Sequence, residues 1–203
     1  MVDWTVLALG LPEKFLMKNS GGGIINTTIS EGTFLAIHVA KRRKMKELNI
    51  ELNDPKTLKF VGYYAEFCYA GADKALFLKN VHYRRAVPSK FCQEKYNFVL
   101  DIEKFREMLK KDVEEGLIPF FYSATYGSTF SAAVDLTPEL IEICKQYKMW
   151  ISLDAAYLGS SWICPELRPN PELLEAVDSI GINFSKTMLT GVPGSPYFVA
   201  DKN

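Results

Sequence analysis

Histidine and closely spaced cysteine are scarce in this sequence of 203 residues, which contains two histidines and four cysteines. The cysteines stand far apart, and no C-x-x-C pair occurs. Structural zinc sites are built from closely spaced cysteine and histidine ligands, so the sequence argues against a metal site. Reduced thiols are expected instead, as in a cytoplasmic protein. The four cysteines are Cys68, Cys92, Cys144 and Cys164.

Long apolar runs and an excess of one charge are also absent. No run of roughly 18 or more apolar residues occurs, so no transmembrane helix is expected, and the N-terminus shows no signal-peptide pattern. The 24 basic and 24 acidic residues cancel, which disfavours a nucleic-acid or membrane-surface partner. A local basic run, Lys41-Arg42-Arg43-Lys44, is interpreted as a solvated helix face. A cytoplasmic location is expected.

Motifs of two large enzyme classes are missing. The nucleophile elbow G-x-S-x-G does not occur, and neither histidine stands near a marked serine, so a serine hydrolase is a weak hypothesis. The patterns G-x-G-x-x-G and G-x-x-x-x-G-K-[ST] are absent as well. Gly21-Gly22-Gly23 is therefore not interpreted as a nucleotide-binding fingerprint.

The sequence does contain an alternation of apolar runs and amphipathic segments. Thr137-Pro138-Glu139 is a clear helix start, Thr28-x-x-Glu31 matches a capping box, and Asp101 and Gly116 can begin and end another helix. The alternation predicts one α/β domain over residues 1–203, with a mainly parallel sheet and helices on both faces. The expected strands span 58–64, 81–87, 117–124, 150–153, 179–183 and 197–200. The expected helices span 3–17, 28–49, 66–78, 101–116, 137–147 and 173–177, and 88–98 is expected to be a loop.

Two chemically suggestive residues follow apolar runs. Asp154 comes directly after the run 150–153, and Lys186 follows the run 179–183. In an open α/β sheet, ligands bind beyond the carboxyl ends of the strands. A lysine amine there can form a Schiff base with an aldehyde, and an acid can pair with the ring nitrogen of pyridoxal 5'-phosphate (PLP). On the residues alone, a solvated lysine and a loop-capping aspartate remain open.

The start of the helix expected at 28–49 is a second candidate site. Thr28, Ile29 and Ser30 place hydroxyls and unpaired backbone amides at a helix N-terminus, where a phosphate group can bind. A capping box without a ligand explains the same residues.

Six short motifs, in this order and at these spacings, resemble the group II PLP-dependent decarboxylases, closest to the aromatic-L-amino-acid decarboxylases. The resemblance implies a fold-type I PLP-dependent transferase-like large domain, truncated here because the match covers only the middle of the family's longer chain. It further implies PLP as cofactor, decarboxylation of an aromatic L-amino acid to an amine and CO2, and a homodimer. The motifs are Gly21-Gly22-Gly23-Ile24-Ile25, Ser30-Glu31-Gly32-Thr33, Gly116-Leu117-Ile118-Pro119-Phe120-Phe121, Asp154-Ala155-Ala156-Tyr157-Leu158-Gly159-Ser160, Ile163-Cys164-Pro165-Glu166 and Asn183-x-x-Lys186.

The resemblance also assigns roles to individual residues. Lys186 falls on the Schiff-base lysine of the family, and Asp154 on the acid that pairs with the ring nitrogen. Residues 28–30 fall on the phosphate site, which Asn183 assists. Small Ala156 falls where the ring packs against the chain. Thr129 falls on a threonine beside the ring, although a hydroxyl in a polar loop explains it equally.

Three positions depart from the family pattern. Tyr69 stands where the family stacks a histidine on the ring; tyrosine can stack, but a phenol does not exchange protons near neutral pH as an imidazole does. Ser185 replaces the histidine that commonly precedes the lysine. Ile29 replaces a small residue in the phosphate site, so its bulk is expected to crowd that group.

These departures keep two alternatives open. One is a truncated, catalytically inactive decarboxylase-like protein, since the family's N-terminal segment and the part beyond the match are missing. The other is an aldehyde-forming relative, because Tyr69 stands where the reaction outcome can change. Both alternatives keep the predicted fold.

Overall fold

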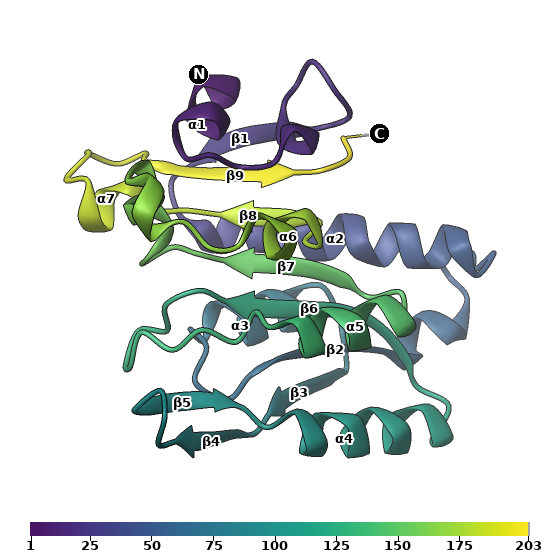
Figure 1. Cartoon of the computed structure of the whole chain (residues 1–203). Helices are drawn as coiled ribbons and strands as arrows, with labels where there is room; N and C mark the ends of the chain where they lie inside the picture. The colour runs from purple at the N-terminus through teal and green to yellow at the C-terminus, as the bar shows by residue number, and fades with distance from the viewer. Residues whose placement is uncertain (203) are drawn as a thin grey trace.

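The computed structural model describes residues 1–202 and places a seven-stranded sheet at the centre of the molecule (Figure 1). In spatial order the strands are β3, β2, β6, β7, β8, β9 and β1. Their bounds are β1 Gly22–Asn26, β2 Phe60–Ala65, β3 Tyr83–Val87, β6 Ile118–Thr125, β7 Trp150–Asp154, β8 Ser179–Gly181 and β9 Ser195–Val199. The helices are α1 Val2–Ala8, α2 Ile29–Glu47, α3 Gly71–Leu78, α4 Ile102–Glu114, α5 Pro138–Gln146, α6 Pro171–Glu175 and α7 Phe184–Thr187.

The sheet is mainly parallel. Neighbouring strands from β3 to β8 run in the same direction, whereas β9 runs antiparallel to both β8 and β1. Strands β2, β6 and β7 are buried almost throughout, as expected for parallel strands that are covered on both faces. The predicted α/β class with a mainly parallel sheet is confirmed.

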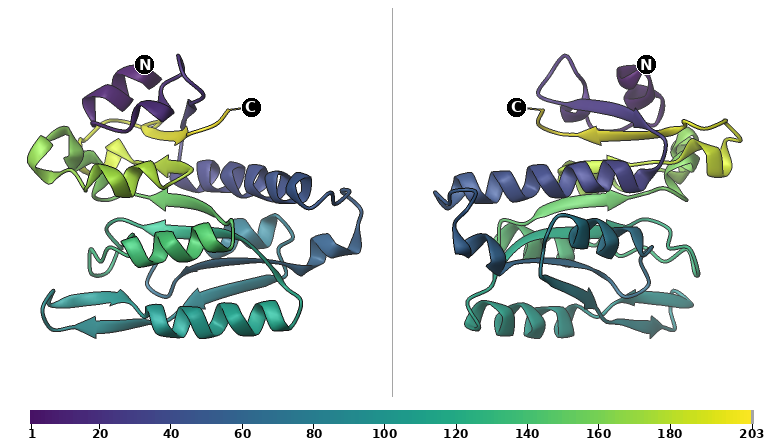
Figure 2. Two further views of the ribbon diagram at one scale, coloured as in Figure 1. Left: turned by 45° about the vertical axis from the view of Figure 1, so that its right-hand side comes forward. Right: turned by 180° about the vertical axis from the view of Figure 1, so that it is seen from behind.

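Helices cover both faces of this sheet. On one face α2 and α3 pack against it, and Ile37 and Leu76 join Phe120 in a buried cluster. On the other face lie α4 and α5, whose Leu109 and Leu140 belong to a second buried cluster. Figure 2 shows α2 running along its face when the molecule is seen from behind. Removing this apolar surface from water is the main source of stability, at about 25 cal/mol per Å².

Two of the predicted helix starts are confirmed by their caps. The Thr137 hydroxyl accepts a hydrogen bond from the backbone amide of Leu140 at 3.3 Å, and α5 begins directly after it. The Asp101 carboxylate accepts one from the amide of Lys104 at 3.4 Å, and α4 follows. Each cap satisfies one of the amides that the first helical turn leaves unpaired.

Two predicted helices are shorter than expected. The helix predicted for 3–17 ends at Ala8, because the chain turns at Gly10 with a φ of 65° and only a short 3-10 turn, Glu13–Phe15, follows Pro12. The helix predicted for 66–78 begins at Gly71 instead. Residues 66–70 form a turn, in which the Cys68 amide donates to the carbonyl of Ala65 at 2.9 Å.

The prediction of a loop at residues 88–98 is wrong. A β-hairpin forms there, with β4 Ser89–Cys92 paired antiparallel to β5 Asn97–Leu100. Its aromatic side chains hold it together: the rings of Phe91 and Phe98 lie 5.7 Å apart, and Phe98 lies 4.7 Å from Phe67.

The basic run in α2 is only partly the solvated face that was predicted: Arg42 and Arg43 are exposed, but Arg43 and Lys44 also make specific contacts. Arg43 forms an ion pair with Asp178 at 2.7 Å and lies over the ring of Trp150 at 4.4 Å. Lys44 is buried, and its ammonium reaches Glu47 and the carbonyl oxygen of Tyr147. Arg43 therefore ties α2 to the sheet, and Lys44 ties α2 to the end of α5.

None of the helices within residues 1–202 is both long enough and apolar enough to cross a lipid bilayer.

Five segments converge beyond the carboxyl ends of the parallel strands, on the left in Figure 1. They are the segments that follow β1, β2, β6, β7 and β8, and they include the starts of α2, α3 and α7. Because parallel strands end at one edge of a sheet, residues distant in sequence meet here.

Candidate functional site

A cavity of about 290 Å³ lies at this edge of the sheet. Its size is close to the lower end of small-molecule sites, roughly 300–1,000 Å³. Nine of the ten predicted site residues line it: Thr28, Ile29, Ser30, Tyr69, Thr129, Asp154, Ala156, Asn183 and Lys186.

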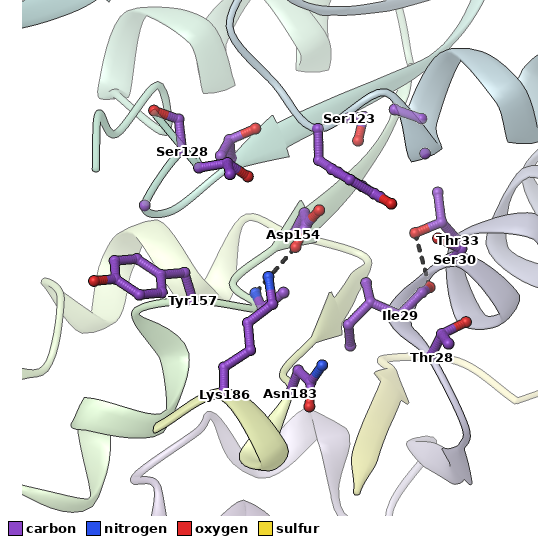
Figure 3. A pocket seen from close by; sticks show the side chains of 17 residues that line it. Thr28, Ile29, Ser30, Thr33, Ser123, Ser128, Asp154, Tyr157, Asn183 and Lys186 are labelled. Atoms are coloured by element: carbon purple, nitrogen blue, oxygen red, sulfur yellow. Dashed lines mark hydrogen bonds between the residues drawn. The ribbon is translucent and has the colours of Figure 1, made fainter. Parts of the chain in front are cut away.

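Asp154 is the acid of the cavity. It ends β7, and its Oδ1 accepts a hydrogen bond from the Ala156 amide at 3.0 Å (Figure 3). Burial raises the pKa of the Asp154 carboxyl, while the Ala156 amide and the positive charge of Lys186 act to lower it. A further cationic partner inside the cavity would stabilise the carboxylate in the same way.

Lys186 approaches Asp154 from the neighbouring strand. It lies in α7, the short helix that follows β8, and β8 pairs parallel with β7 so that Asp154 and Gly181 are register partners. Figure 3 shows the lysine side chain extending toward Asp154. The amine and the carboxylate therefore face one cavity.

The N-terminus of α2 forms another part of the wall. Thr28 occupies the N-cap position, but its side chain makes no capping hydrogen bond. Of the two hydrogen bonds of the predicted capping box, only the one to Glu31 forms. Its donor is the backbone amide of Thr27, at 3.0 Å, instead of the amide of Thr28. The Thr28 hydroxyl and the first-turn amides consequently lie at the cavity as donors suited to an anion.

Ile29, which was expected to crowd this region, has most of its side chain buried in the fold. It is 8% exposed and belongs to the cluster between α2 and the sheet. A Cβ added to Gly181 would lie 3.1 Å from Ile29 Cγ2 and 2.8 Å from the Tyr197 ring. Because Gly181 has no side chain, the isoleucine at position 29 has room to pack there.

Asn183 has a fixed orientation. Its Oδ1 accepts hydrogen bonds from both the backbone amide of Ser185, at 2.9 Å, and the Ser185 hydroxyl, at 2.5 Å. A backbone amide can only donate, so the acceptor must be the side-chain oxygen. The amide nitrogen remains for the cavity, where Figure 3 shows it. Ser185 itself does not line the cavity; it acts on Asn183.

Tyr69 and Thr129 lie at the outer part of the cavity. Tyr69 is 58% exposed, in the turn before α3, and Thr129 is exposed in the loop that follows β6. Both positions leave the side chains accessible to a bound molecule.

The sequence did not single out several further lining residues. Ser123 and Thr125 are buried hydroxyl residues at the end of β6, and Thr125 Oγ1 has no hydrogen-bond partner among the described residues. Hydroxyls at alternate positions near the end of an apolar strand were the available signal. The complete set that was not predicted is Thr33, Gly71, Ala72, Ser123, Thr125, Gly127, Ser128 and Tyr157.

These residues fit PLP. Donors at the start of α2 suit its phosphate, Asp154 suits its protonated ring nitrogen, and Lys186 suits its aldehyde. The orphaned Thr125 hydroxyl marks a polar position that a bound molecule could satisfy. Residues 1–202 contain no group of three or more histidine, cysteine and acidic side chains suited to a metal ion.

Comparison with known proteins agrees with this chemistry. Residues 1–203 match the pyridoxal-dependent decarboxylase conserved domain. The chain is 37% identical over 195 residues to the aromatic-L-amino-acid decarboxylase of Manduca sexta, covering 93% of this chain and 37% of that protein. It superposes on Oryza sativa TDC solved with PLP and tryptamine (TM-score 0.87, 28% identity, 98% and 41% of the two chains). It also superposes on Rhodiola rosea 4-hydroxyphenylacetaldehyde synthase (TM-score 0.86, 26% identity, 98% and 42%). The chain thus spans about two fifths of the length of these relatives.

Proposed function

The chain belongs to the pyridoxal-dependent decarboxylase family, and we propose that it forms the cofactor-binding core of an enzyme that converts an aromatic L-amino acid to its amine and CO2. The observation that carries this proposal is the convergence of Asp154 and Lys186 on one cavity, from the ends of two neighbouring parallel strands. The similarity to a decarboxylase solved with tryptamine supports an aromatic substrate.

Different parts of the cavity suit different groups of PLP. The Lys186 amine, once it has lost its proton, can bond to an aldehyde carbon with loss of water. Asp154 would hold a proton on the ring nitrogen, and Ala156 would leave space beside it. Thr28, Ile29 and Ser30 would hold the phosphate through hydroxyls and amides, and Asn183 would add its side-chain nitrogen. Tyr69 would stack on the ring, with Thr129 beside it.

When bound, PLP supplies the sink for the electron pair that remains when the bond between the α-carbon and the carboxylate breaks. The residues of the chain bind and orient the reacting groups, and a proton then replaces the lost CO2. A tyrosine can stack on a ring as a histidine can, but a phenol exchanges protons less readily near neutral pH than an imidazole does.

Formation of an aldehyde is a second candidate. It is favoured by the similarity to 4-hydroxyphenylacetaldehyde synthase and by Tyr69 in place of the expected histidine. In that reaction dioxygen is reduced to hydrogen peroxide and one water is consumed, while CO2 and ammonia leave. The products distinguish the two reactions, since only one of them releases ammonia and peroxide.

We also propose a homodimer in the cytoplasm. An open apolar groove of about 850 Å³ between α2 and α3 supports the dimer, because it borders the cavity and is lined by Phe34, Leu35 and Leu78. Leu35 and Leu78 are 45% and 55% exposed, so they give this groove an apolar surface that a partner could cover. The four unpaired cysteines support a reducing compartment.

A PLP titration tests the cofactor site. We expect the parent chain to develop the absorbance band of lysine-bound PLP and Lys186→Ala to show only free PLP. Asp154→Asn should weaken binding about 10- to 100-fold, because a charge-assisted contact worth roughly 1.5–3 kcal/mol is lost. Glu142→Gln, on the exposed side of α5, is the control. Identical spectra for the parent and Lys186→Ala would refute the proposal.

Incubation with aromatic amino acids tests the reaction. Equal amounts of amine and CO2 identify a decarboxylase, whereas aldehyde with ammonia and peroxide identifies the second candidate. Binding of PLP without either product would show that the described residues bind the cofactor but do not complete the reaction.

A further inference from the structure

Asp135 is a buried acid that lies behind the cavity and outside its wall. It is 5% exposed and follows the loop that leaves β6. Acidic residues are seldom buried so completely without a specific partner. Its surroundings therefore indicate what it does.

Asp135 is bound on two sides to the end of β6. Its backbone amide donates to the Thr125 carbonyl at 3.1 Å, and its Oδ1 accepts a short hydrogen bond from the Thr125 amide. Its Oδ2 accepts from the hydroxyl of Tyr122 at 3.4 Å. The residue thus closes the base of the loop 126–134.

That loop forms a wall of the cavity. Gly127, Ser128 and Thr129 line the cavity, and the amides of Gly127 and Ser128 both donate to the Ala133 carbonyl at 3.0 Å. The loop is also joined to the acid of the site, because the Tyr126 amide donates to the Asp154 carbonyl at 2.8 Å. A displacement at Thr125 would therefore reach both the loop and Asp154.

We propose that Asp135 is a positioning residue for the cofactor site: it fixes the end of β6 and the loop 126–134, so that the loop wall and Asp154 keep their relative places. This inference rests on the proposed function for the identity of the molecule that the wall contacts. Asp135 touches neither that molecule nor the cavity, and it acts through Thr125 and Tyr126.

The charges of the two acids agree with this role. Burial, with a smaller contribution from the nearby Asp154, raises the pKa of Asp135 to about 7, although the hydrogen bonds from Thr125 and Tyr122 act to lower it. Near neutral pH the buried acid is therefore partly protonated, which reduces its repulsion of Asp154.

Substitutions at Asp135 separate hydrogen bonding from charge. Asp135→Asn keeps an oxygen for the Thr125 amide and a polar atom for Tyr122, whereas Asp135→Ala removes both. Asp135→Ser is a milder second variant, too short to reach both partners. The control is Asp112→Ala: Asp112 is also buried and accepts from the hydroxyl of Tyr63 at 2.9 Å, it is paired with Arg85 as well, and it lies away from the cavity.

The first measurement is amide hydrogen exchange of the chain without cofactor. We expect Asp135→Ala and Asp135→Ser to accelerate exchange in the peptide 125–135 about tenfold or more relative to the rest of the chain, and Asp135→Asn to leave it near the parent rate. Asp112→Ala should accelerate exchange elsewhere. Parent-like exchange of 125–135 in both Asp135→Ala and Asp135→Ser would overturn the inference.

The second measurement is the PLP titration. Asp135→Ala and Asp135→Ser should bind PLP about tenfold more weakly, with rescue by Asp135→Asn to within about threefold of the parent, while Asp112→Ala binds as the parent does. Unchanged affinity in all Asp135 variants would refute the positioning role but leave the cofactor site intact. If the parent itself binds no PLP, the proposed function fails, and the exchange experiment still decides whether Asp135 holds the loop.

Discussion

At the scale of single residues, the contact between Ser185 and Asn183 shows how a site residue is oriented by a neighbour outside the cavity. Ser185→Ala removes one of the two donors to Asn183 Oδ1 and keeps the backbone donor. We expect PLP binding to weaken about 2- to 10-fold, as for the loss of one hydrogen bond of roughly 0.5–1.5 kcal/mol. Titration with PLP, followed by absorbance, measures this loss of affinity.

The double variant of these two residues is the control. If Ser185 acts only through Asn183, then adding Ser185→Ala to Asn183→Ala should produce little further loss. Additive losses would contradict the proposed orientation and would indicate that Ser185 contacts the bound molecule.

The buried Asp135 predicts a pH dependence of stability. Its pKa is about 7 in the folded chain against 3.8 for an ordinary aspartate carboxyl, so between these pH values the folded state holds a proton that the unfolded state has lost. The free energy of unfolding keeps the full contribution of this proton below about pH 3.8. It falls by roughly 2–4 kcal/mol as the pH rises toward 7. Urea unfolding at several pH values should show a steeper fall in the parent than in Asp135→Asn, because the raised pKa of Asp154 contributes to the fall in both proteins.

The groups that face Asp135 do not obscure this comparison. Burial raises the pKa of Tyr122 well above its ordinary value and the pKa of Cys68 to about 12, so neither titrates between pH 4 and pH 7. Asp154 is present in both proteins. Parallel pH profiles of the parent and Asp135→Asn would contradict the raised pKa.

The sequence predicted those site residues that residue type and position after an apolar run identify. Asp154 and Lys186 follow apolar runs, and the structure brings both to one cavity. Asp135 and Ser123 were not found, because their importance depends on pairing between segments that the sequence does not specify. The only signal for Asp135 was an acid within the apolar stretch 132–136. The functional roles of all these residues remain predictions.

At the scale of secondary-structure elements, we expect substitutions of two threonines at helix starts to have opposite effects on stability and on PLP binding. Thr137 caps α5 through its side chain, whereas Thr28 makes no capping bond to α2 and lines the cavity. Thr137→Ala should cost about 1 kcal/mol and lower Tm by about 2–4 °C, with PLP affinity unchanged. Thr28→Ala should change Tm less and weaken PLP binding about 2- to 10-fold.

Thermal unfolding and PLP titration of both variants check this pair, and each threonine serves as the other's control. Equal losses of stability would show that Thr28 caps α2 after all. Unchanged PLP affinity in Thr28→Ala would remove its hydroxyl from the phosphate site.

Elements with strong local signals were predicted well, and the hairpin β4–β5 was not. The runs that became β6 and β7 are mostly apolar, and the strands are buried along almost their whole length. The hairpin strands have four residues each and exposed positions, and they depend on ring contacts such as Phe67 with Phe98. Such contacts arise only after the chain has folded, so short strands of this kind carry little signal.

At the scale of the whole molecule, the close approach of α2 to the sheet predicts the effect of a single methyl group. A Cβ at Gly32 would lie 2.1 Å from the ring of Tyr197. Gly32→Ala should therefore destabilise the chain by about 1–3 kcal/mol or more, although alanine is intrinsically the better helix former. Gly191→Ala is the control, since nothing lies within 4 Å of a Cβ there.

Thermal or urea unfolding measures this effect. A rise in Tm for Gly32→Ala would show that helix propensity outweighs the clash and that α2 is held less closely than the structure indicates. Equal effects of both glycine substitutions would lead to the same conclusion.

The arrangement of the whole sheet was predictable only in outline. Alternating strands and helices indicated a parallel core, but nothing in 195–199 announced that β9 would run in the opposite direction between β8 and β1. Strand order is a property of long-range pairing, and local pattern does not specify it.

The pairing of β1 with β9 sets an order of events during synthesis. Gly22 is the register partner of Val199, so the strand that leads into α2 has no neighbour until nearly the whole described chain has been made. Loop closure over such a separation is slow, and β8 presents an open edge in the meantime. A nascent chain that pauses before Ser195 would therefore hold a free edge at β8 and an unpaired β1, and such exposed strands favour chaperone binding at this stage.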